Sequence, residues 1–361
     1  MNFKVLYSNK KNNDFSKTLR KRVNQYFERN NISRHANKSM IFKTIVMLSL
    51  YIVPYILIIS NIFQPWLIII FYIIMGIGTA GIGMNVMHDA AHNSYSKNKS
   101  INKIIGASMY LVGGNIYNWK IQHNYLHHFH TNIYGLDEDI ETKFLLRLSP
   151  HSRHRFYHRL QPFYAVIFYS LMTMSFLLQD LQQLFRFRSQ GLIAESEKSF
   201  FKEVMILIST KTLYLTLLLL LPLLLSFSWS YILLGFLLMH LTAGLIMSTV
   251  FQLAHQVEGL EQPLPDKDGK IDHNYSVHQL LIASDFSQRN KFITWFTGGL
   301  NFQIEHHLYP SICHVHYPAI SIIVKKTARE YQIPYHYFDS FFGALKSHVK
   351  TLSILGHQKA S

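Results

Sequence analysis

Four stretches of the chain consist almost entirely of apolar residues. Each is long enough to cross a lipid bilayer as a helix, which takes about 20 residues. The links within the first and second pair, NIFQP and SFSWS, are short and carry no charge, so each pair is predicted to form a membrane hairpin. The predicted membrane helices are residues 44–60, 66–84, 205–226 and 231–252. The pattern therefore predicts an all-α integral membrane protein with four transmembrane helices.

Basic residues mark the ends of these hairpins that face the cytosol. Residues 1–43 contain eleven lysines and arginines, and the positive-inside rule assigns such segments to the cytosolic side. The N-terminus, residues 85–204 and the C-terminal third are then cytosolic, and we expect them to form a helical cap. Residues 1–43 have no apolar core typical of a cleavable signal; they are either a solvated basic segment or an amphipathic helix on anionic lipid. Along the chain we expect an N-terminal segment, a main domain and a tail, at 1–43, 44–340 and 341–361.

Two features of the apolar pattern are less regular. Residues 162–178, PFYAVIFYSLMTMSFLL, are free of charge, but a span here would put His88 and His306 on opposite sides of the membrane. We therefore expect this stretch to lie at the interface or against the hairpins. Lys211 falls at the start of the third apolar stretch, and we expect its long side chain to extend to the cytosolic interface.

Composition and charge support a membrane protein. Apolar residues make up 49% of the 361 residues and charged residues only 15%, with a net charge of +15. In a soluble protein such a charge would indicate nucleic acid, but here the basic residues flank apolar stretches, so we expect a membrane surface and no nucleic acid. Cys313 is the only cysteine, which excludes an internal disulfide and a zinc site built on several thiolates.

The 21 histidines include three clusters with the spacing of metal ligands. In an α-helix, residues four apart lie on one face, so His88 with His92, and His123 with His127, can each present two imidazoles to one centre. Adjacent residues diverge by about 100°, so neighbouring histidines favour two metals over one. The candidate ligands from the three clusters, with one more after the fourth span, are His88, His92, His123, His127, His128, His306, His307 and His255.

The ligand type restricts the metal. Imidazole suits zinc, copper, iron and nickel, and two metals at a membrane face indicate oxygen chemistry on a lipid, which zinc cannot support because it has no redox chemistry. The HDAAH cluster also resembles the zinc-protease pattern HExxH, but Asp89 stands in place of the glutamate base and the pattern leaves the other clusters unexplained. GIGTAG (76–81) lies inside a span and indicates close helix packing rather than a dinucleotide turn. DKDG (266–269) lacks the glutamate of a calcium loop, having Val277 at that position.

Taken together, the clusters resemble those of the membrane fatty acid desaturase superfamily. HDAAH, HNYLHH and QIEHH are similar to its HxxxH, HxxxHH and QxxHH boxes in order and spacing, and the glutamine at the head of the third box resembles the front-end acyl desaturases. FQLAHQVEG and WFTGGLNFQIEHHLYP also look like family sequence, so the resemblance covers roughly residues 40 to 340. It implies a cytosolic cap that holds two non-haem iron ions, ligated by the eight histidines above. It further implies O2-dependent insertion of a double bond into a fatty acyl chain of a lipid or acyl-CoA.

The chain departs from the wider superfamily at two positions. Gln303 stands where many members have a histidine, and Phe251 stands where some have an asparagine. His278 is a candidate to fill the gap. Residues expected to orient the ligands by hydrogen bonds are Gln303, Asp89 and His278, with His130, His314 and His316 in similar roles. The acidic run DEDIE (137–141) either helps in the same way or is a solvated loop.

The resemblance also implies an electron supply. No His-Pro-Gly-Gly sequence of a fused cytochrome b5 domain occurs in the chain, so we expect electrons from NAD(P)H to arrive through a separate ferredoxin or cytochrome b5-type carrier. Two other functions stay open: a hydroxylase on the same scaffold, which would add oxygen instead of a double bond, and a membrane metal transporter, which would need polar groups within its spans.

Overall fold

The computed structural model of the chain describes residues 5–8, 13–141, 144–193, 196–225 and 228–358, and these are mostly helical. They form two compact units. One, called here the span unit, comprises residues 38–121 and 166–249. The other, called the histidine-rich unit, comprises residues 1–37, 122–165 and 250–361 and contains 18 of the 21 histidines. The predicted helical fold class is confirmed.

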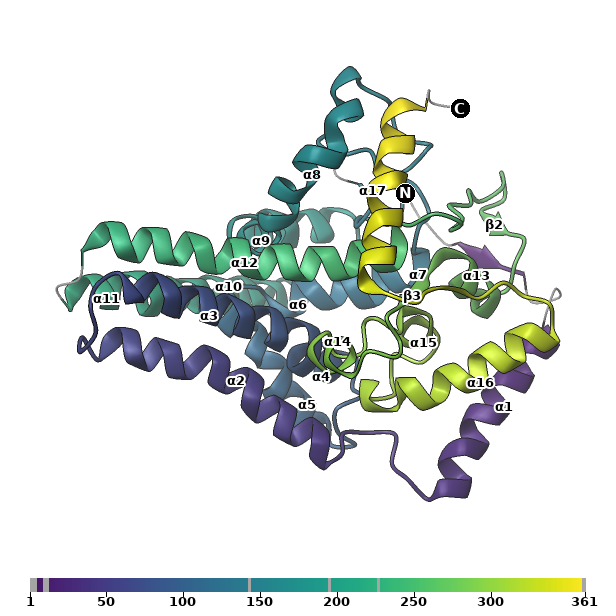
Figure 1. Ribbon diagram of the computed structural model, residues 1–361, viewed down its shortest axis with the longest axis horizontal. Coiled ribbons are helices and arrows are strands. Elements are labelled where there is room, and N and C mark those ends of the chain that lie inside the picture. Colours follow the sequence, from purple (N-terminus) through teal and green to yellow (C-terminus); the bar gives the residue numbers. More distant parts are fainter. Residues whose placement is uncertain (1–4, 9–12, 142–143, 194–195, 226–227, 359–361) are drawn as a thin grey trace. The chain divides into compact units, whose positions relative to one another are not determined.

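The structure confirms four helices that are long and apolar enough to cross a membrane. Each of these helices is longer than the apolar stretch that predicted it, because polar turns extend its ends. Position 226, at the end of the third predicted helix, lies outside the described residues. Figure 1 shows α2, α3, α10 and α12 lying alongside one another. The four candidate spans are Lys38–Ile59 (α2), Leu67–Ala91 (α3, Leu67–Gly81; η1, Ile82–Met87; α4, His88–Ala91), Glu197–Leu224 (α10, Glu197–Leu215; η5, Thr216–Leu220; α11, Leu221–Leu224) and Trp229–His255 (α12).

Small residues let the spans approach closely, as GIGTAG predicted. A Cβ added at Gly76 would lie 2.5 Å from the Met239 carbonyl oxygen of α12, and one at Gly78 would lie 2.8 Å from the Leu50 backbone of α2. Two spans therefore meet α3 at adjacent glycines, and helix association in membranes depends on this kind of close backbone packing. The prediction that GIGTAG is a packing motif is confirmed.

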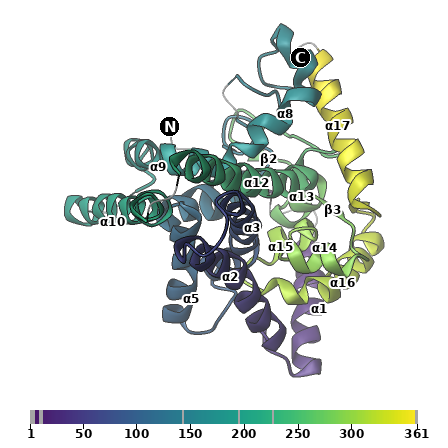
Figure 2. The same cartoon turned by 60° about the vertical axis from the view of Figure 1, so that its left-hand side comes forward.

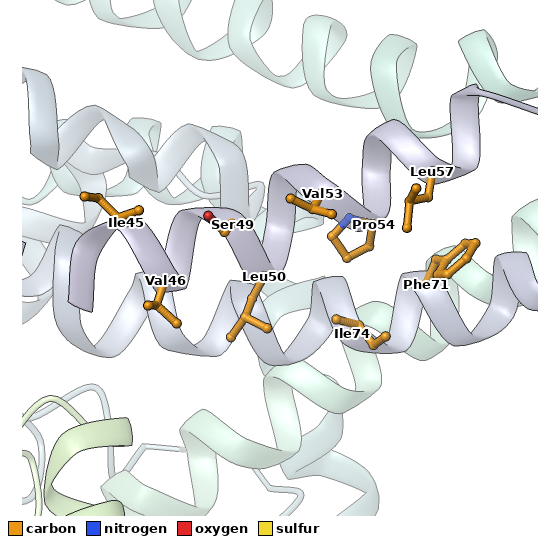
Figure 3. Close-up of a pocket in the computed structure, with 9 residues that line it drawn as sticks. All are labelled: Ile45, Val46, Ser49, Leu50, Val53, Pro54, Leu57, Phe71 and Ile74. Atoms are coloured by element: carbon orange, nitrogen blue, oxygen red, sulfur yellow. The ribbon is translucent and has the colours of Figure 1, made fainter. Parts of the chain in front are cut away.

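An apolar groove of about 440 Å³ lies between α2 and α3. Pro54 sits inside α2, and Ser49 is the one polar side chain of the nine in Figure 3. A surface of this composition matches hydrocarbon and not water, which fits the assignment of α2 and α3 as membrane helices.

Lys211 differs from its prediction. Its side chain does not extend to an interface. Its amine lies 2.6 Å from a carboxylate oxygen of Asp180 in α9 (Met172–Ser189) and donates to the Phe176 carbonyl at 2.8 Å. Both charged groups are largely buried. The ion pair with Asp180 and the hydrogen bond to Phe176 satisfy the ammonium group inside the protein. The lysine side chain therefore does not need to reach water at the membrane interface.

Residues 162–178 form two helices and not one. α8 (Gln161–Ser170) follows the 3₁₀ turn η4 (Phe156–Leu160), and the axis bends by 66° before α9. Such a pair is long enough to span only as a broken helix. The interfacial position of this stretch stays a prediction. The remaining helices of the span unit are short: α5 (Lys99–Gly106), η2 (Ala107–Val112) and α6 (Ile116–Trp119).

The histidine-rich unit is built from short helices around one apolar core. Its N-terminal helix α1 (Asn13–Asn30) places Phe15, Leu19, Val23 and Phe27 in that core, against α16 (Tyr317–Glu330). Figures 1 and 2 both show α1 beside α16. The apolar face of this basic segment is therefore buried in protein and does not lie on lipid. The other helices are η3 (Lys120–His127), α7 (His128–His130), α13 (Tyr275–Ile282), α14 (Lys291–Phe296), α15 (Gln303–Leu308), η6 (His314–His316) and α17 (Phe341–His357).

Two small parallel sheets join distant parts of this unit. β1 (Leu6–Tyr7) pairs with β2 (Lys270–Ile271), and β3 (Ser284–Phe286) pairs with β4 (His336–Phe338). The second pairing sets Asp285 opposite Tyr337, so residues flanking β4 are brought next to α15. The sheets thus support the segment that carries the third histidine cluster.

Candidate metal centre

His88 and His92 are held at the end of the second span. η1, which precedes them, is a π-helix, and α4 then presents both rings with their centroids 4.8 Å apart. Trp119 lies against the two rings at 5.6 and 5.8 Å. Asp89, which lies between the two histidines along the chain, is also buried. The predicted i, i+4 pair therefore forms within the span unit.

The second cluster forms on a π-helix, which the spacing argument did not anticipate. η3 (Lys120–His127) has the wider turn of a π-helix, so residues five apart also share a face. Nε2 of His123 lies 3.3 Å from Nε2 of His128, while the rings of His123 and His127 stack at 5.4 Å. His123 thus faces both later histidines. π-helical turns are frequent at functional sites, and here two of them precede histidine clusters.

His307 belongs to a buried group of three imidazoles. A ring nitrogen from each of His127, His255 and His307 lies within 4.8 Å of those of the other two. The ring centroids are 4.9 to 5.1 Å apart. These residues come from three separate segments, so the fold, and not local sequence, brings them together.

In this group, Nδ1 of each ring has an acceptor on its outer side. His127 Nδ1 lies 3.1 Å from Asp137, and His255 Nδ1 lies 3.3 Å from the Ile282 carbonyl. His307 Nδ1 lies 3.4 Å from the Thr131 hydroxyl, which itself donates to the His127 carbonyl. An acceptor at Nδ1 directs the lone pair to Nε2, on the side where a metal would bind. This arrangement suits rings that would hold a metal through Nε2.

Asp137 belongs to the acidic run DEDIE but is not solvated. Its side chain is fully buried and also accepts the backbone N–H of Asn132 at 2.8 Å. Burial lowers the pKa of His127, but the carboxylates of Asp137 and Asp139 outweigh it and raise that pKa to about 9. At least one residue of the run thus orients a candidate ligand.

Gln303 takes a position inside the His307 group. Its amide Nε2 lies 3.0 Å from Nε2 of His255 and 3.1 Å from Nε2 of His307. Its Oε1 is buried with no hydrogen-bond partner among the described residues. The amide therefore occupies the space toward which both imidazole lone pairs are directed.

The neighbouring His306 belongs to a different group. Its ring packs at 4.7 Å from His128 and stacks at 5.8 Å on His123. The Tyr317 hydroxyl lies 3.3 Å from its Nδ1. His306 and His307 thus point to different neighbours, as adjacent positions on the helix α15 require. His128 lies against both, with its ring 4.4 Å from that of His307.

Two buried carboxyl groups support α15 from behind. Asp285 accepts the backbone N–H of Ile304 at 3.0 Å and the Tyr335 hydroxyl at 2.5 Å. The same hydroxyl lies 3.1 Å from Glu305. Burial, together with the neighbouring Asp285 carboxylate, raises the pKa of Glu305 well above its usual range. Sequence reasoning missed this support, because Asp285 and Tyr335 are distant from the third cluster along the chain.

His278 does not join either imidazole group among the described residues. Its Nε2 donates to the Thr131 carbonyl at 3.1 Å, so it positions the threonine that contacts His307. His130 similarly donates to the Leu126 carbonyl and His316 to the His35 carbonyl. His314 is buried on η6.

A cavity of about 250 Å³ opens beside His255. Its wall includes Gln256, Gln262 and Leu355. The His307 group therefore borders a space large enough for small molecules such as water or O2.

The donor set fits a redox metal. It consists of buried imidazoles with Nε2 directed inward, an unsatisfied amide oxygen and no thiolate. Imidazole-rich sites of this kind bind iron, copper, nickel or zinc. The fold and these groups are those of a protein with four membrane-length helices and clusters of imidazoles that could hold a metal.

Comparison with known proteins identifies the family. The fatty acid desaturase family model matches residues 64–339, and the chain belongs to that family. It is 33% identical to an sn-1 linoleoyl-lipid 6-desaturase of Arthrospira platensis, over 96% of this chain and 94% of that protein. A second sn-1 linoleoyl-lipid 6-desaturase, from Synechocystis, is 32% identical over 95% of each chain. An acyl-lipid (8-3)-desaturase of Physcomitrium patens is 33% identical over 97% of this chain and 73% of its own length.

Proposed function

We propose that this desaturase introduces a double bond into a fatty acyl chain of a membrane lipid, using O2, two iron ions and electrons from a separate carrier. The observation that carries the proposal is the division of α15 between two imidazole groups. His307 is grouped with His127 and His255, while the ring of His306 stacks on that of His123. His128 packs against both, 4.4 Å from the His307 ring and 4.7 Å from the His306 ring. Adjacent histidines directed at different groups are what two neighbouring metals require.

The protein would hold the metals and orient their ligands. The proposed ligands are His88, His92, His123, His127, His128, His255, His306 and His307. Bound there, iron would supply the reaction with O2 that removes hydrogen from unactivated C–H bonds. Asp137, Thr131 and Tyr317 hold the rings in place from their outer sides. Gln303, whose amide lies beside Nε2 of His255 and of His307, would be a weak or absent ligand and would leave room there for O2.

The overall reaction balances only with an external reductant. A CH2–CH2 unit loses two hydrogens with two electrons, while reduction of O2 to two waters takes four electrons and four protons. Two electrons and two protons must therefore come from elsewhere, and we propose NAD(P)H through a ferredoxin or cytochrome b5-type protein as the source.

The names of the relatives support an acyl-lipid substrate and a double bond near the carboxyl end. The basic residues of the N-terminal segment support a cytosolic position for the histidine-rich unit. We assign residues 44–340 to the catalytic domain, flanked by the N-terminal segment (1–43) and the tail (341–361).

Expression in a host that makes linoleoyl lipids, followed by fatty-acid profiling, tests the proposal. We expect a new double bond on the carboxyl side of the existing one, located by mass spectrometry of derivatised acyl chains. A hydroxy fatty acid as the main product would indicate the hydroxylase instead. An unchanged lipid profile with an active electron donor, together with metal that exchanges freely, would favour the transporter.

A further inference from the structure

The electron balance, which rests on the proposed function, requires a partner that reaches the metal centre from outside. We propose that the exposed basic face formed by α1, the residues that follow it to Arg34, and α16 is the docking surface for a small acidic electron carrier. This surface is called here the basic face. All of it belongs to the histidine-rich unit.

The basic face carries a concentrated positive charge. Residues 13–34 and 317–330 hold nine lysines and arginines against three acidic residues. Among the described residues, Arg22 is the only one of the nine in an ion pair, with Glu330 at 2.6 Å. The side chains that are exposed are Lys17, Arg20, Lys21, Arg29, Arg34, Lys326 and Arg329. A patch of this sign raises the rate at which an acidic protein associates.

The two helices hold these charges on a rigid support. α1 buries its apolar residues against Ile320 and Val324 of α16, and the Arg22–Glu330 pair and a Thr18–Tyr331 hydrogen bond of 2.8 Å join the helices at their outer side. Both figures show the helices side by side. Because the apolar face of α1 is used within the unit, its charged face remains available to a partner.

A short chain of contacts leads from this face to a candidate ligand. The guanidinium carbon of Arg34 lies 5.3 Å from the Phe27 ring, and that ring lies 5.2 Å from the ring of His316. The next residue, Tyr317, brings its hydroxyl to 3.3 Å from Nδ1 of His306. Two aromatic rings and one peptide bond therefore separate Arg34 from Tyr317 and His306. Such a short path to a candidate ligand would serve a partner that delivers electrons, whereas lipid binding has no need of it.

The distribution of exposed apolar residues also favours a protein partner. Helices that lie on membranes place large apolar side chains in the lipid, but α1 has none among its exposed residues. In the same unit, Phe156 is 83% exposed and Phe163 is 77% exposed, on η4 and α8. The basic face as a whole exposes two large apolar side chains, Ile322 at 70% on α16 and Ile32 at 39% after α1. A lipid surface is therefore more strongly indicated at η4 and α8 than at the basic face.

Charge reversal tests the surface. The variant Arg20→Glu/Arg329→Glu is compared with the matched variant Lys267→Glu/Lys346→Glu, which makes the same change in net charge at exposed positions elsewhere in the unit. Each iron-loaded protein is assayed in nanodiscs of zwitterionic lipid with an acidic [2Fe–2S] ferredoxin and its NADPH-dependent reductase. At low ionic strength we expect the KM for ferredoxin to rise about 10-fold or more in the first variant only. The kcat at saturating ferredoxin should change little, and the salt dependence should weaken.

A small chemical reductant, dithionite, provides the second measurement because it needs no docking surface. Because dithionite also consumes O2, the iron is reduced without O2, the excess dithionite is removed and O2 is then added. The double bonds formed in this single turnover should equal those formed by the wild type. A KM unchanged from the matched control would overturn the proposal, as would a loss of turnover with both reductants, since these residues would then maintain the centre itself. A KM that shifts only in nanodiscs with anionic lipid would assign the face to lipid and also overturn it. A wild type that forms no double bond with either reductant would instead contradict the proposed function.

Discussion

The two units treat buried polar groups in opposite ways. In the span unit, two sets of buried polar side chains bond to one another: Lys211 pairs with Asp180, and His240 lies between the hydroxyls of Thr173 and Tyr214 at 3.0 Å each. In the histidine-rich unit, the Nδ1 atoms of His127, His255 and His307 meet acceptors on the outer side of the rings, and the Nε2 atoms of His255 and His307 face inward, where both meet the amide of Gln303. Closed sets stabilise helices in a medium without water, whereas outward bonds orient ligands for a metal.

The largest expected effect comes from removing His307 from the three-imidazole group. His307→Ala removes a ligand and the contacts to His127 and His255, so desaturation should fall to background, a loss of roughly 100-fold or more. Fatty-acid profiling and iron analysis of the purified protein provide the measurement. His357→Ala, at an exposed histidine of α17, is the matched control and should keep both activity and iron. Full activity in the His307 variant would show that this group holds no catalytic metal.

Loss of a buried charge in the span unit should lower the stability of the protein and not change its chemistry. Lys211→Met leaves Asp180 buried without its cation, which we expect to lower the free energy of unfolding by about 3–5 kcal/mol. The double variant Lys211→Met/Asp180→Leu removes both charges and should recover much of this loss. Thermal unfolding in detergent gives the comparison. Equal destabilisation by the single and double variants would mean that the pair is not energetically coupled.

Sequence patterns predicted the membrane-length helices and the candidate ligands for different reasons. Apolar runs of about 20 residues define membrane helices almost by themselves, and histidine spacing singled out His306 and His307. The partners could not be predicted, because Asp137, Thr131 and Tyr317 contact the rings through tertiary structure. The π-helix before His128 was also missed, since its wider turn results from packing and not from any local signal. The same reasoning failed for Lys211, whose partner lies 31 positions away in the sequence.

An intermediate effect should follow from the carboxylate behind His127. Asp137→Asn keeps the size of the side chain but removes the charge that holds Nδ1–H of the ring. We expect iron affinity or activity to fall by about 10- to 100-fold, with the lipid product unchanged in kind. Iron titration and turnover measure this, and Asp268→Asn, at an exposed loop position, is the control. Normal iron affinity and normal turnover in this variant would show that the Asp137 carboxylate supports only the fold.

The smallest effect is expected at the support of α15, where the histidine-rich unit itself contains a closed polar set. Tyr335→Phe removes one hydroxyl that bridges Asp285 and Glu305, while Asp285 keeps its bonds to Ile304 and Gln288. The net cost should be about 1 kcal/mol of unfolding free energy. If the support also positions the third histidine cluster, iron retention should decline slightly as well. Tyr337→Phe, at a half-exposed tyrosine two residues away, should change neither quantity. A Tyr335 variant that loses stability but keeps its iron would show that this polar set stabilises the fold without positioning the histidines. The histidine-rich unit would then contain both kinds of arrangement, a closed polar set and hydrogen bonds directed outward from the rings.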